Sequence, residues 1–233
     1  MKKLLLFALM FVSMTAIAQR DVTKFLGIPV DGYKSDMKEK LIGKGFTYNE
    51  DKDYFEGEFN GSKVNVFIVT NNNKVWRIMV ADAIPCSETN IRIRFNNLCR
   101  QFLKNKKYIA FDLEAADYII PEDEDISYEM LVNKKRYEAA FYQIPDTTLL
   151  DTVAIQNRIM KELLKEYTQN EIDNPSDKQM KKMDLIVKNE KLNMIFEIME
   201  KKMVWFNINE RYGNYYISIF YENEYNRADG EDL

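Results

Sequence analysis

Apolar side chains recur along the chain with two periods, and the longer period predicts helices. In 88–105 they follow steps of three and four residues behind a capping Ser87, at Ile91, Phe95, Leu98 and Phe102. The same spacing predicts a short helix around Met37 and Leu41 that ends at Gly43, and helices at 152–168 and 180–200. The last of these also suits two short strands, at 185–187 and 194–199, and 170–177 is predicted as a loop.

The shorter period, alternation of apolar and polar residues, predicts two groups of strands. The first is a meander of 54–59, 63–70 and 74–82, in which Asn60-Gly61 is typical of a type I′ hairpin turn. The second comprises a hairpin of 126–132 with 136–143 and a closing hairpin of 203–209 with 215–222. Hairpin-length turns join these strands, so we expect an α+β fold with a mainly antiparallel sheet and helices packed on one face.

These elements divide the chain into five parts. They are a signal peptide (1–18), an N-terminal α+β lobe (19–105), a connecting segment (106–125), a C-terminal α+β lobe (126–222) and a polar tail (223–233). The sequence leaves open whether the two lobes are separate domains or share one sheet, because a chain of this length permits either.

The first residues have the pattern of a cleaved export signal. Lys2 and Lys3 precede an unbroken apolar run, Leu4–Val12, and Ala16-Ile17-Ala18 is the small-x-small pattern that signal peptidase cuts. A membrane anchor is the alternative, but Leu4–Ala18 is fifteen residues long and a bilayer span needs about 20. We therefore expect cleavage before Gln19, a periplasmic or secreted protein, and no membrane span after cleavage.

Composition excludes several classes of function. The net charge of -4 disfavours binding of nucleic acid, since phosphate neutralisation needs a basic surface. The chain contains no His, which excludes catalytic triads and His-ligated zinc, and it has no glycine-rich phosphate loop. The acidic run Glu122-Asp123-Glu124-Asp125 lacks the spacing of a calcium loop. We expect no catalytic residues, no metal and no cofactor.

Two cysteines, Cys86 and Cys99, lie thirteen residues apart. Most of that interval is predicted helix, which rises by about 1.5 Å per residue, or roughly 20 Å in all. The Cα atoms of a disulfide lie within about 7 Å of each other. The sequence therefore predicts two free, largely buried thiols, and redox chemistry has no CxxC motif in its favour.

An aromatic surface is the strongest candidate for a binding site. Alternation in the closing hairpin places Trp205, Tyr216 and Phe220 on the face opposite the core. Exposed Trp and Tyr side chains are typical anchors of interfaces, although another element covering this face would give a plain packing role instead. We expect a non-enzymatic interaction module that binds a protein or other macromolecule through a sheet face. The alternative is a carboxylate-based enzyme, or a carrier of small molecules or glycans, with a cleft between the lobes.

Two threonines stand in short patterns that suit modification. Asp146-Thr147-Thr148 and Asp151-Thr152-Val153 resemble the Asp-Ser/Thr-apolar acceptor that Bacteroides-type bacteria use for O-glycosylation. A sugar at Thr147 or Thr152 requires that the side chain be exposed.

Several stretches spread over the chain carry a resemblance to a known family. They are Ala16-Ile17-Ala18-Gln19, Phe25-Leu26-Gly27-Ile28-Pro29-Val30-Asp31-Gly32, Arg94-Phe95-Asn96-Asn97-Leu98, and the closing sequence from Trp205-Phe206 to Asn226-Arg227-Ala228-Asp229-Gly230-Glu231-Asp232-Leu233. Together they resemble uncharacterised secreted proteins of Bacteroides-type gut bacteria, over nearly the whole chain after the signal. The resemblance implies a periplasmic or cell-surface location, but it does not imply any particular activity.

The order of the first elements carries a second likeness. A short helix entered through a glycine-containing turn, then a meander and a covering helix, is similar to the repeat unit of beta-lactamase inhibitory protein. That inhibitor has two such units in tandem with a disulfide in each, and this sequence departs from that pattern. A likeness in architecture does not establish function.

Overall fold

The structure is a computed structural model that describes residues 20–112 and 118–228, so the predicted signal peptide lies outside the described residues. The chain forms two compact units. The larger comprises 22–145 and the residues from 189 onward, and the smaller comprises 146–188 with residues 20 and 21. Helix α6 (Asp177–Glu200) contributes residues to both units. The boundaries between these units therefore differ from the boundaries of the two predicted lobes.

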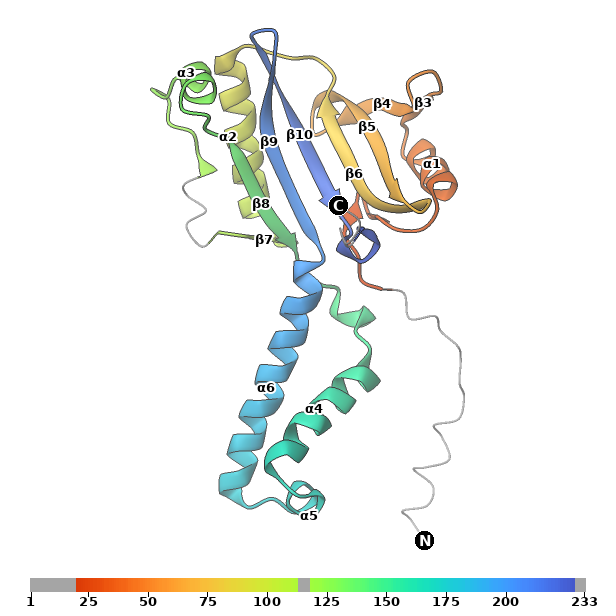
Figure 1. Cartoon of the computed structure of the whole chain (residues 1–233), viewed down its shortest axis with the longest axis vertical. Coiled ribbons are helices and arrows are strands. Elements are labelled where there is room, and N and C mark those ends of the chain that lie inside the picture. Colours follow the sequence, from red (N-terminus) through yellow and green to blue (C-terminus); the bar gives the residue numbers. More distant parts are fainter. Residues whose placement is uncertain (1–19, 113–117, 229–233) are drawn as a thin grey trace. The chain divides into compact units, whose positions relative to one another are not determined.

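The larger unit is built on an eight-stranded antiparallel sheet (Figure 1), which confirms the predicted α+β class. The strand order is β3-β4-β5-β6-β10-β9-β8-β7. Their bounds are Thr47–Asn49 (β3), Tyr54–Phe59 (β4), Ser62–Asn71 (β5), Lys74–Asp82 (β6), Tyr108–Ala110 (β7), Glu138–Gln143 (β8), Met203–Arg211 (β9) and Asn214–Glu222 (β10). Strands β6 and β10 are adjacent, so both predicted lobes contribute to one sheet. A separate small ribbon pairs β1 (Lys24–Phe25) with β2 (Ile28–Pro29).

Tight turns set the register of the sheet. Three hairpins close through two residues with positive φ, the combination that defines a type I′ turn: Asn60-Gly61, Asn72-Asn73 and Tyr212-Gly213. The first confirms the turn predicted from Asn60-Gly61. These turns join β4 to β5, β5 to β6 and β9 to β10, so residues on neighbouring strands align across the sheet.

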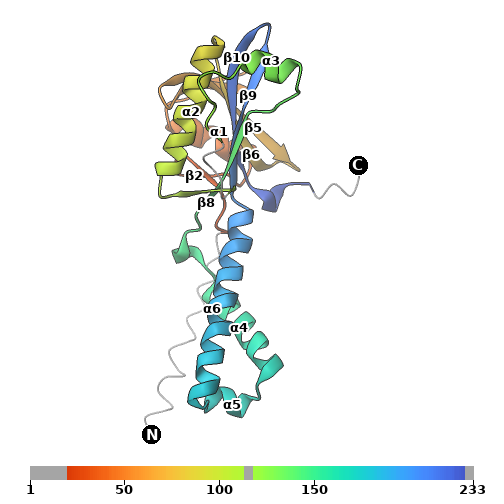
Figure 2. The same cartoon turned by 90° about the vertical axis from the view of Figure 1, so that its left-hand side faces the viewer.

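Two helices cover one face of the sheet, here called the inner face. They are α1 (Lys34–Gly43) and α2 (Glu88–Lys104), and Figure 2 shows both on the same side of the strands. Ile91, Phe95 and Leu98 of α2 are fully buried, as the helical period predicts. The Ser87 side chain accepts a hydrogen bond from Asn90 N, which confirms the predicted cap. The core of the unit therefore lies between α2 and the inner face.

Polar side chains tie α2 to its surroundings. The Arg94 guanidinium binds both oxygens of the Asp82 carboxylate, which also accepts a hydrogen bond from Ile217 N on β10. Asn96 donates to the carbonyl of Ile120 at 2.8 Å and accepts from its amide at 2.9 Å. These bonds fix α2 against two neighbouring strands and hold 118–120 beside it.

The prediction of a strand at 126–132 is wrong, because this stretch forms helix α3 (Ile126–Leu131). Its first turn is stabilised by Asp125, whose side chain accepts from Tyr128 N at 2.8 Å. Strand β8 therefore pairs with β9 and with the short edge strand β7, which lies inside the predicted connecting segment.

The predicted polar tail begins with packed residues. A 3₁₀ turn, η3 (Glu224–Asn226), follows β10, and Asn223 is completely buried with its side chain bonded to the Val30 carbonyl. The Asn226 side chain donates to Asp31 and to the Val75 carbonyl. Residues 223–228 are therefore part of the fold, and 229–233 lie outside the described residues.

The smaller unit is helical. It contains the 3₁₀ turn η2 (Thr147–Leu149), α4 (Thr152–Glu166), α5 (Gln169–Asp173) and the first half of α6, so helices at 152–168 and 180–200 are confirmed. Helix α5 lies where a loop was expected, because Thr168 and Glu171 form a capping box. Among the described residues of this unit, only Leu163 and Met183 are buried hydrophobic side chains. The small core predicts a low local stability.

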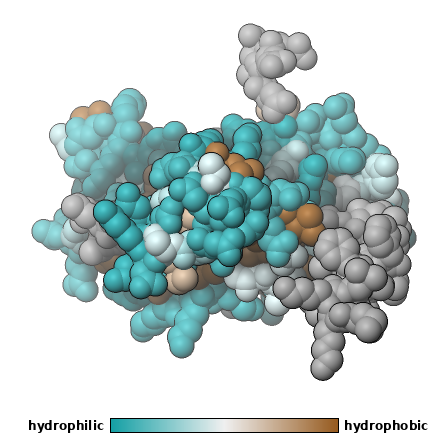
Figure 3. Space-filling model, turned by 90° about the horizontal axis from the view of Figure 1, so that it is seen from below, coloured by the Kyte–Doolittle hydropathy of each residue, from teal (hydrophilic) through white to brown (hydrophobic). Residues whose placement is uncertain are grey.

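The surface seen from below is predominantly hydrophilic, with small brown patches between larger teal areas (Figure 3). Within 20–112 and 118–228, no helix combines the length and the apolar character that spanning a bilayer requires.

Candidate functional site

Cross-strand pairing aligns large apolar side chains in one line over the outer face, the face opposite α1 and α2. On β6, Met79 pairs with Phe67 of β5 and with Phe220 of β10. Phe220 pairs with Trp205 of β9, Trp205 pairs with Ala140 of β8, and the Phe111 amide donates to the Ala140 carbonyl at 2.9 Å. We call this line the apolar row: Phe67, Met79, Phe220, Trp205, Ala140 and Phe111.

The row crosses the middle of the sheet and is open to solvent. Phe67, Met79, Phe220 and Trp205 are each partly exposed, and Phe111 is 56% exposed. At the far end, the ring of Tyr54 on β4 lies 5.3 Å from that of Phe67. Alternation along each strand places the core residues on the inner face, so the row is not part of the core.

Trp205 is held in a fixed orientation at the centre of the row. Its indole stacks on Phe220 with ring centroids 4.1 Å apart and an angle of 18° between the planes. Its Nε1 donates to Glu222 Oε1 at 2.6 Å. The Glu222 side chain is only 4% exposed and also forms an ion pair with Arg77, whose guanidinium lies 5.1 Å from the Phe220 ring centroid. The indole is thus held by stacking, by a hydrogen bond and by a cation–π contact with Arg77, whose guanidinium lies 5.9 Å from the indole centroid.

Glu224 extends this group of charges. Burial, and next a hydrogen bond with Glu222, raises the pKa of Glu224, because two close carboxylates do not both ionise readily. Arg227 lies 3.3 Å from the Glu224 carboxylate. Glu222 is thus hydrogen-bonded to Glu224 and also binds Arg77 and Trp205. The Glu222 carboxylate therefore helps to hold both the indole and the guanidinium in place.

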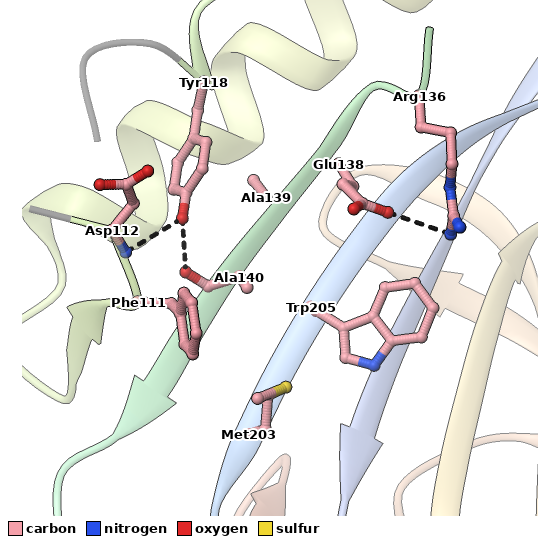
Figure 4. Close-up of a pocket in the computed structure, with 9 residues that line it drawn as sticks. All are labelled: Phe111, Asp112, Tyr118, Arg136, Glu138, Ala139, Ala140, Met203 and Trp205. Carbon is pink, nitrogen blue, oxygen red and sulfur yellow. Dashed lines mark hydrogen bonds and ion pairs between the residues drawn. The ribbon is translucent and has the colours of Figure 1, made fainter. Parts of the chain in front are cut away.

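A recess interrupts the apolar row at Ala140 (Figure 4). Its volume is about 490 Å³, and Ala140 on β8 lies at its floor, with Ala139 also among the lining residues. Trp205 borders it on one side, and Phe111 and Tyr118 border it on the other. The recess exists because alanine stands where neighbouring positions of the row carry large side chains.

Several polar groups around the recess are bonded to one another. Arg136 and Glu138 form an ion pair at 3.1 Å. The Tyr118 hydroxyl donates to the Ala140 carbonyl and accepts from the Asp112 amide, both at 3.3 Å. Burial raises the pKa of Tyr118, so this hydroxyl stays protonated and does not act as a base near neutral pH.

A polar row runs beside the apolar one. Glu138 pairs with Asn207, and Asn207 pairs with Ser218. The Asn209 side chain donates to the Ser218 hydroxyl at 3.1 Å and to Asn207 at 3.2 Å. This network separates Tyr216 from the apolar row, because Tyr216 is four residues from Phe220 along β10, roughly 13 Å at the rise of a strand.

The structure therefore places the three predicted aromatic residues on one face but brings only two of them together. Trp205 and Phe220 stack, and Tyr216 stands apart opposite Asn209. Sequence reasoning missed Phe111, Tyr118, Arg77 and Glu222. Alternation already placed Glu222 on the outer face, so a charged residue at the end of an aromatic strand was the available signal.

The two predicted glycosylation sites are exposed and lie at the starts of helical turns. Thr147 is the first residue of η2, and Thr152 is the first residue of α4. The preceding aspartates cap these turns: Asp146 accepts from Thr148 N, and Asp151 accepts from Val153 N and Ala154 N. The aspartates thus have a structural role, whether or not the threonines are modified.

The acidic run has structural contacts. Glu124 pairs with Lys135 and accepts from the Tyr137 hydroxyl, and Asp125 caps α3. No group of three or more His, Cys, Asp or Glu side chains in the described part of the chain is placed to hold a metal ion.

Both thiols are free, as the sequence predicts. Cys99 is buried in α2, and burial raises its pKa to about 12. Cys86 is partly exposed, and burial also raises its pKa. Neither has the lowered pKa of a reactive thiolate.

Fold and site together define an α+β protein with an open, aromatic sheet face. A scan of protein-family models found no match for the chain, and searches of curated proteins and of solved structures also found none.

Proposed function

We propose that the protein is a non-enzymatic interaction module that binds a protein or another macromolecule through its outer sheet face. The apolar row carries this proposal. Its aromatic side chains are partly exposed to solvent, whereas aromatic side chains that only pack against another layer of the fold are buried. Trp, Tyr and Phe are enriched at interfaces. A locked Trp205 adds to the case, because an ordered anchor loses little side-chain entropy on binding.

The module acts outside the cytoplasm. The charged start, apolar run and Ala16-Ile17-Ala18 site support export, and a periplasmic or surface address is also what the family resemblance implies. Mass spectrometry of the protein from its native host tests this: the processed chain begins at Gln19, whereas an intact Met1 contradicts export.

The alternative function, a carboxylate-based enzyme or a carrier of small molecules or glycans, has one observation in its favour. The recess of about 490 Å³ has the size of a small-molecule site. However, of the two carboxylates that line it, Glu138 is paired with Arg136, and the adjacent carboxylates of Glu222 and Glu224 do not line it. We therefore favour the interaction module.

Affinity capture tests the proposed function. The processed chain is used to recover partners from a periplasmic extract, and the recovered partner is then purified and titrated against the wild type and the variants. We expect Trp205→Ala to weaken binding at least tenfold, as at an interfacial hot spot, and Tyr216→Ala to weaken it less.

Ile42→Ala is the matched control, since Ile42 is 54% exposed but lies on α1, which packs on the inner face. Equal affinities of the wild type and Trp205→Ala, with both folded, contradict the proposal.

A further inference from the structure

The gap in the apolar row is one ring wide at Ala140, although the whole recess, at about 490 Å³, is larger than a single ring. Trp205 and Phe111 flank Ala140 on either side, and Ala140 contributes only a methyl group. Neighbouring strands lie about 4.8 Å apart, so side chains on the two flanking strands stand roughly 10 Å apart. One ring in van der Waals contact with both walls occupies about 7–8 Å of that distance, and two rings exceed it.

The charged groups that line the recess stand toward one end of it. Arg136 and Glu138 form an ion pair there, and Asp112 is the third charged residue of the lining. The other end is lined by Phe111, Ala140, Met203 and Trp205, whose Nε1 is bonded to Glu222 (Figure 4). This apolar end suits an uncharged group.

The apolar end of the recess distinguishes between two kinds of ring. A sugar needs donors and acceptors for its hydroxyl groups, and burying them without partners is costly. An aromatic side chain needs only apolar walls, and aromatic pairs gain stability beyond the area that they bury. The walls here are Trp205, Phe111 and Tyr118, whose faces are what such a side chain contacts.

We infer that the recess at Ala140 binds one uncharged aromatic side chain, Trp, Phe or Tyr, of a protein partner. This inference rests on the proposed function, since it names the anchor by which the partner engages the outer face. The stacked pair of Trp205 and Phe220 forms the fixed wall, and the exposed Phe111 forms the opposite wall.

The test uses small probes in place of the partner. The processed chain, with alanine methyl groups labelled with ¹³C, is titrated with N-acetyl-tryptophanamide, N-acetyl-leucinamide and methyl glucoside, and the Ala140 methyl signal is followed by NMR. We expect saturable shifts of this signal with the tryptophan probe in the millimolar range, and none with the other two.

Two variants locate the binding. Ala140→Leu narrows the gap between Trp205 and Phe111, and Phe111→Ala removes an exposed wall; we expect each to weaken binding of the tryptophan probe at least fivefold. In Phe111→Ala and in the control, the Ala140 methyl signal reports binding. In Ala140→Leu, the methyl group of Met203, which also lines the recess, is labelled and reports it. Ala154→Leu is the matched control, an identical substitution at an exposed position of α4. Thermal unfolding verifies that each variant is folded.

The outcomes separate this inference from the proposed function. Equal binding of the leucine probe, or binding of methyl glucoside, overturns it in favour of an unselective or a glycan site. Absence of tryptophan-probe binding also overturns it, and the proposed function then stands if partner affinity still depends on Trp205. If the probe binds but partner affinity is independent of Trp205, the ring site stands and the proposed function fails.

Discussion

Removal of the Glu222 carboxylate is the sharpest test of how Trp205 is held. Glu222→Ala leaves the indole Nε1 of Trp205 and the guanidinium of Arg77 without their shared acceptor. The Glu222 side chain is 4% exposed, so water does not readily replace the lost oxygen. We expect a loss of stability and a loss of orientation of the indole.

The size of the loss follows from the burial of the two partners. Removing one member of a buried ion pair costs about 3–5 kcal/mol. Because the Arg77 side chain is 22% exposed and regains some hydration, we expect the lower end, about 3 kcal/mol. Glu222→Gln keeps an oxygen for Trp205 and removes only the charge, so we expect about 1–1.5 kcal/mol. For a chain of this size, the larger loss lowers Tm by roughly 6–12 °C.

Urea unfolding at neutral pH, followed by near-UV circular dichroism, measures these differences. Glu58→Ala is the matched control, because Glu58 is an exposed glutamate on β4 and such substitutions change stability by less than about 0.5 kcal/mol. A loss below about 1 kcal/mol for Glu222→Ala refutes the reasoning, since it means that Trp205 and Arg77 find other partners.

Three further predictions concern the thiols, one surface carboxylate and the helical unit. At about pH 8, iodoacetamide leaves Cys99 unmodified and reacts slowly with Cys86, and both react in urea; rapid native labelling of Cys99 contradicts its burial. Hydrogen bonds from Lys34 and then Tyr48 lower the pKa of Asp53 to about 2. Asp53→Asn therefore lowers the free energy of unfolding by less than about 1 kcal/mol above about pH 4, because solvent screens this exposed group. The difference from the wild type disappears as the pH falls through 2, and unfolding measured across this pH range tests it. Amide hydrogens of α4 exchange with solvent faster than those of β9 and β10, because Leu163 and Met183 give the smaller unit only a small core. Equally slow exchange in α4 contradicts this.

Local patterns were sufficient to predict the closing hairpin and its two faces. Val204, Phe206 and Ile208 are buried, and Trp205 between them is partly exposed, as strict alternation requires. The turn at Tyr212-Gly213 keeps both strands in register, so one face stays apolar from end to end. Here a period of two and a tight turn, both properties of neighbouring residues, determine the structure.

Elements that depend on distant contacts were not predictable in this way. The stretch 126–132 contains Ile126, Tyr128 and Val132, residues that favour strands, but the Asp125 cap and burial of Ile126 against the core select a helix. The pairing of β6 with β10 joins residues about 140 positions apart, and no local pattern encodes it. The sequence therefore left the number of sheets open.

The recess at Ala140 shows why a binding site is harder to predict than the fold that carries it. In the sequence, Ala139-Ala140 only lowers the strand propensity of this stretch, because alanine has a low preference for strands. Ala140 lines a recess only because β7 and β9 flank β8 in the sheet and place Phe111 and Trp205 beside it. In the chain, β7 precedes the helical unit and β9 follows it. A small residue thus becomes a site only where tertiary pairing surrounds it with large ones. For that reason, Ala140→Leu is expected to leave the fold intact and to remove the ring site.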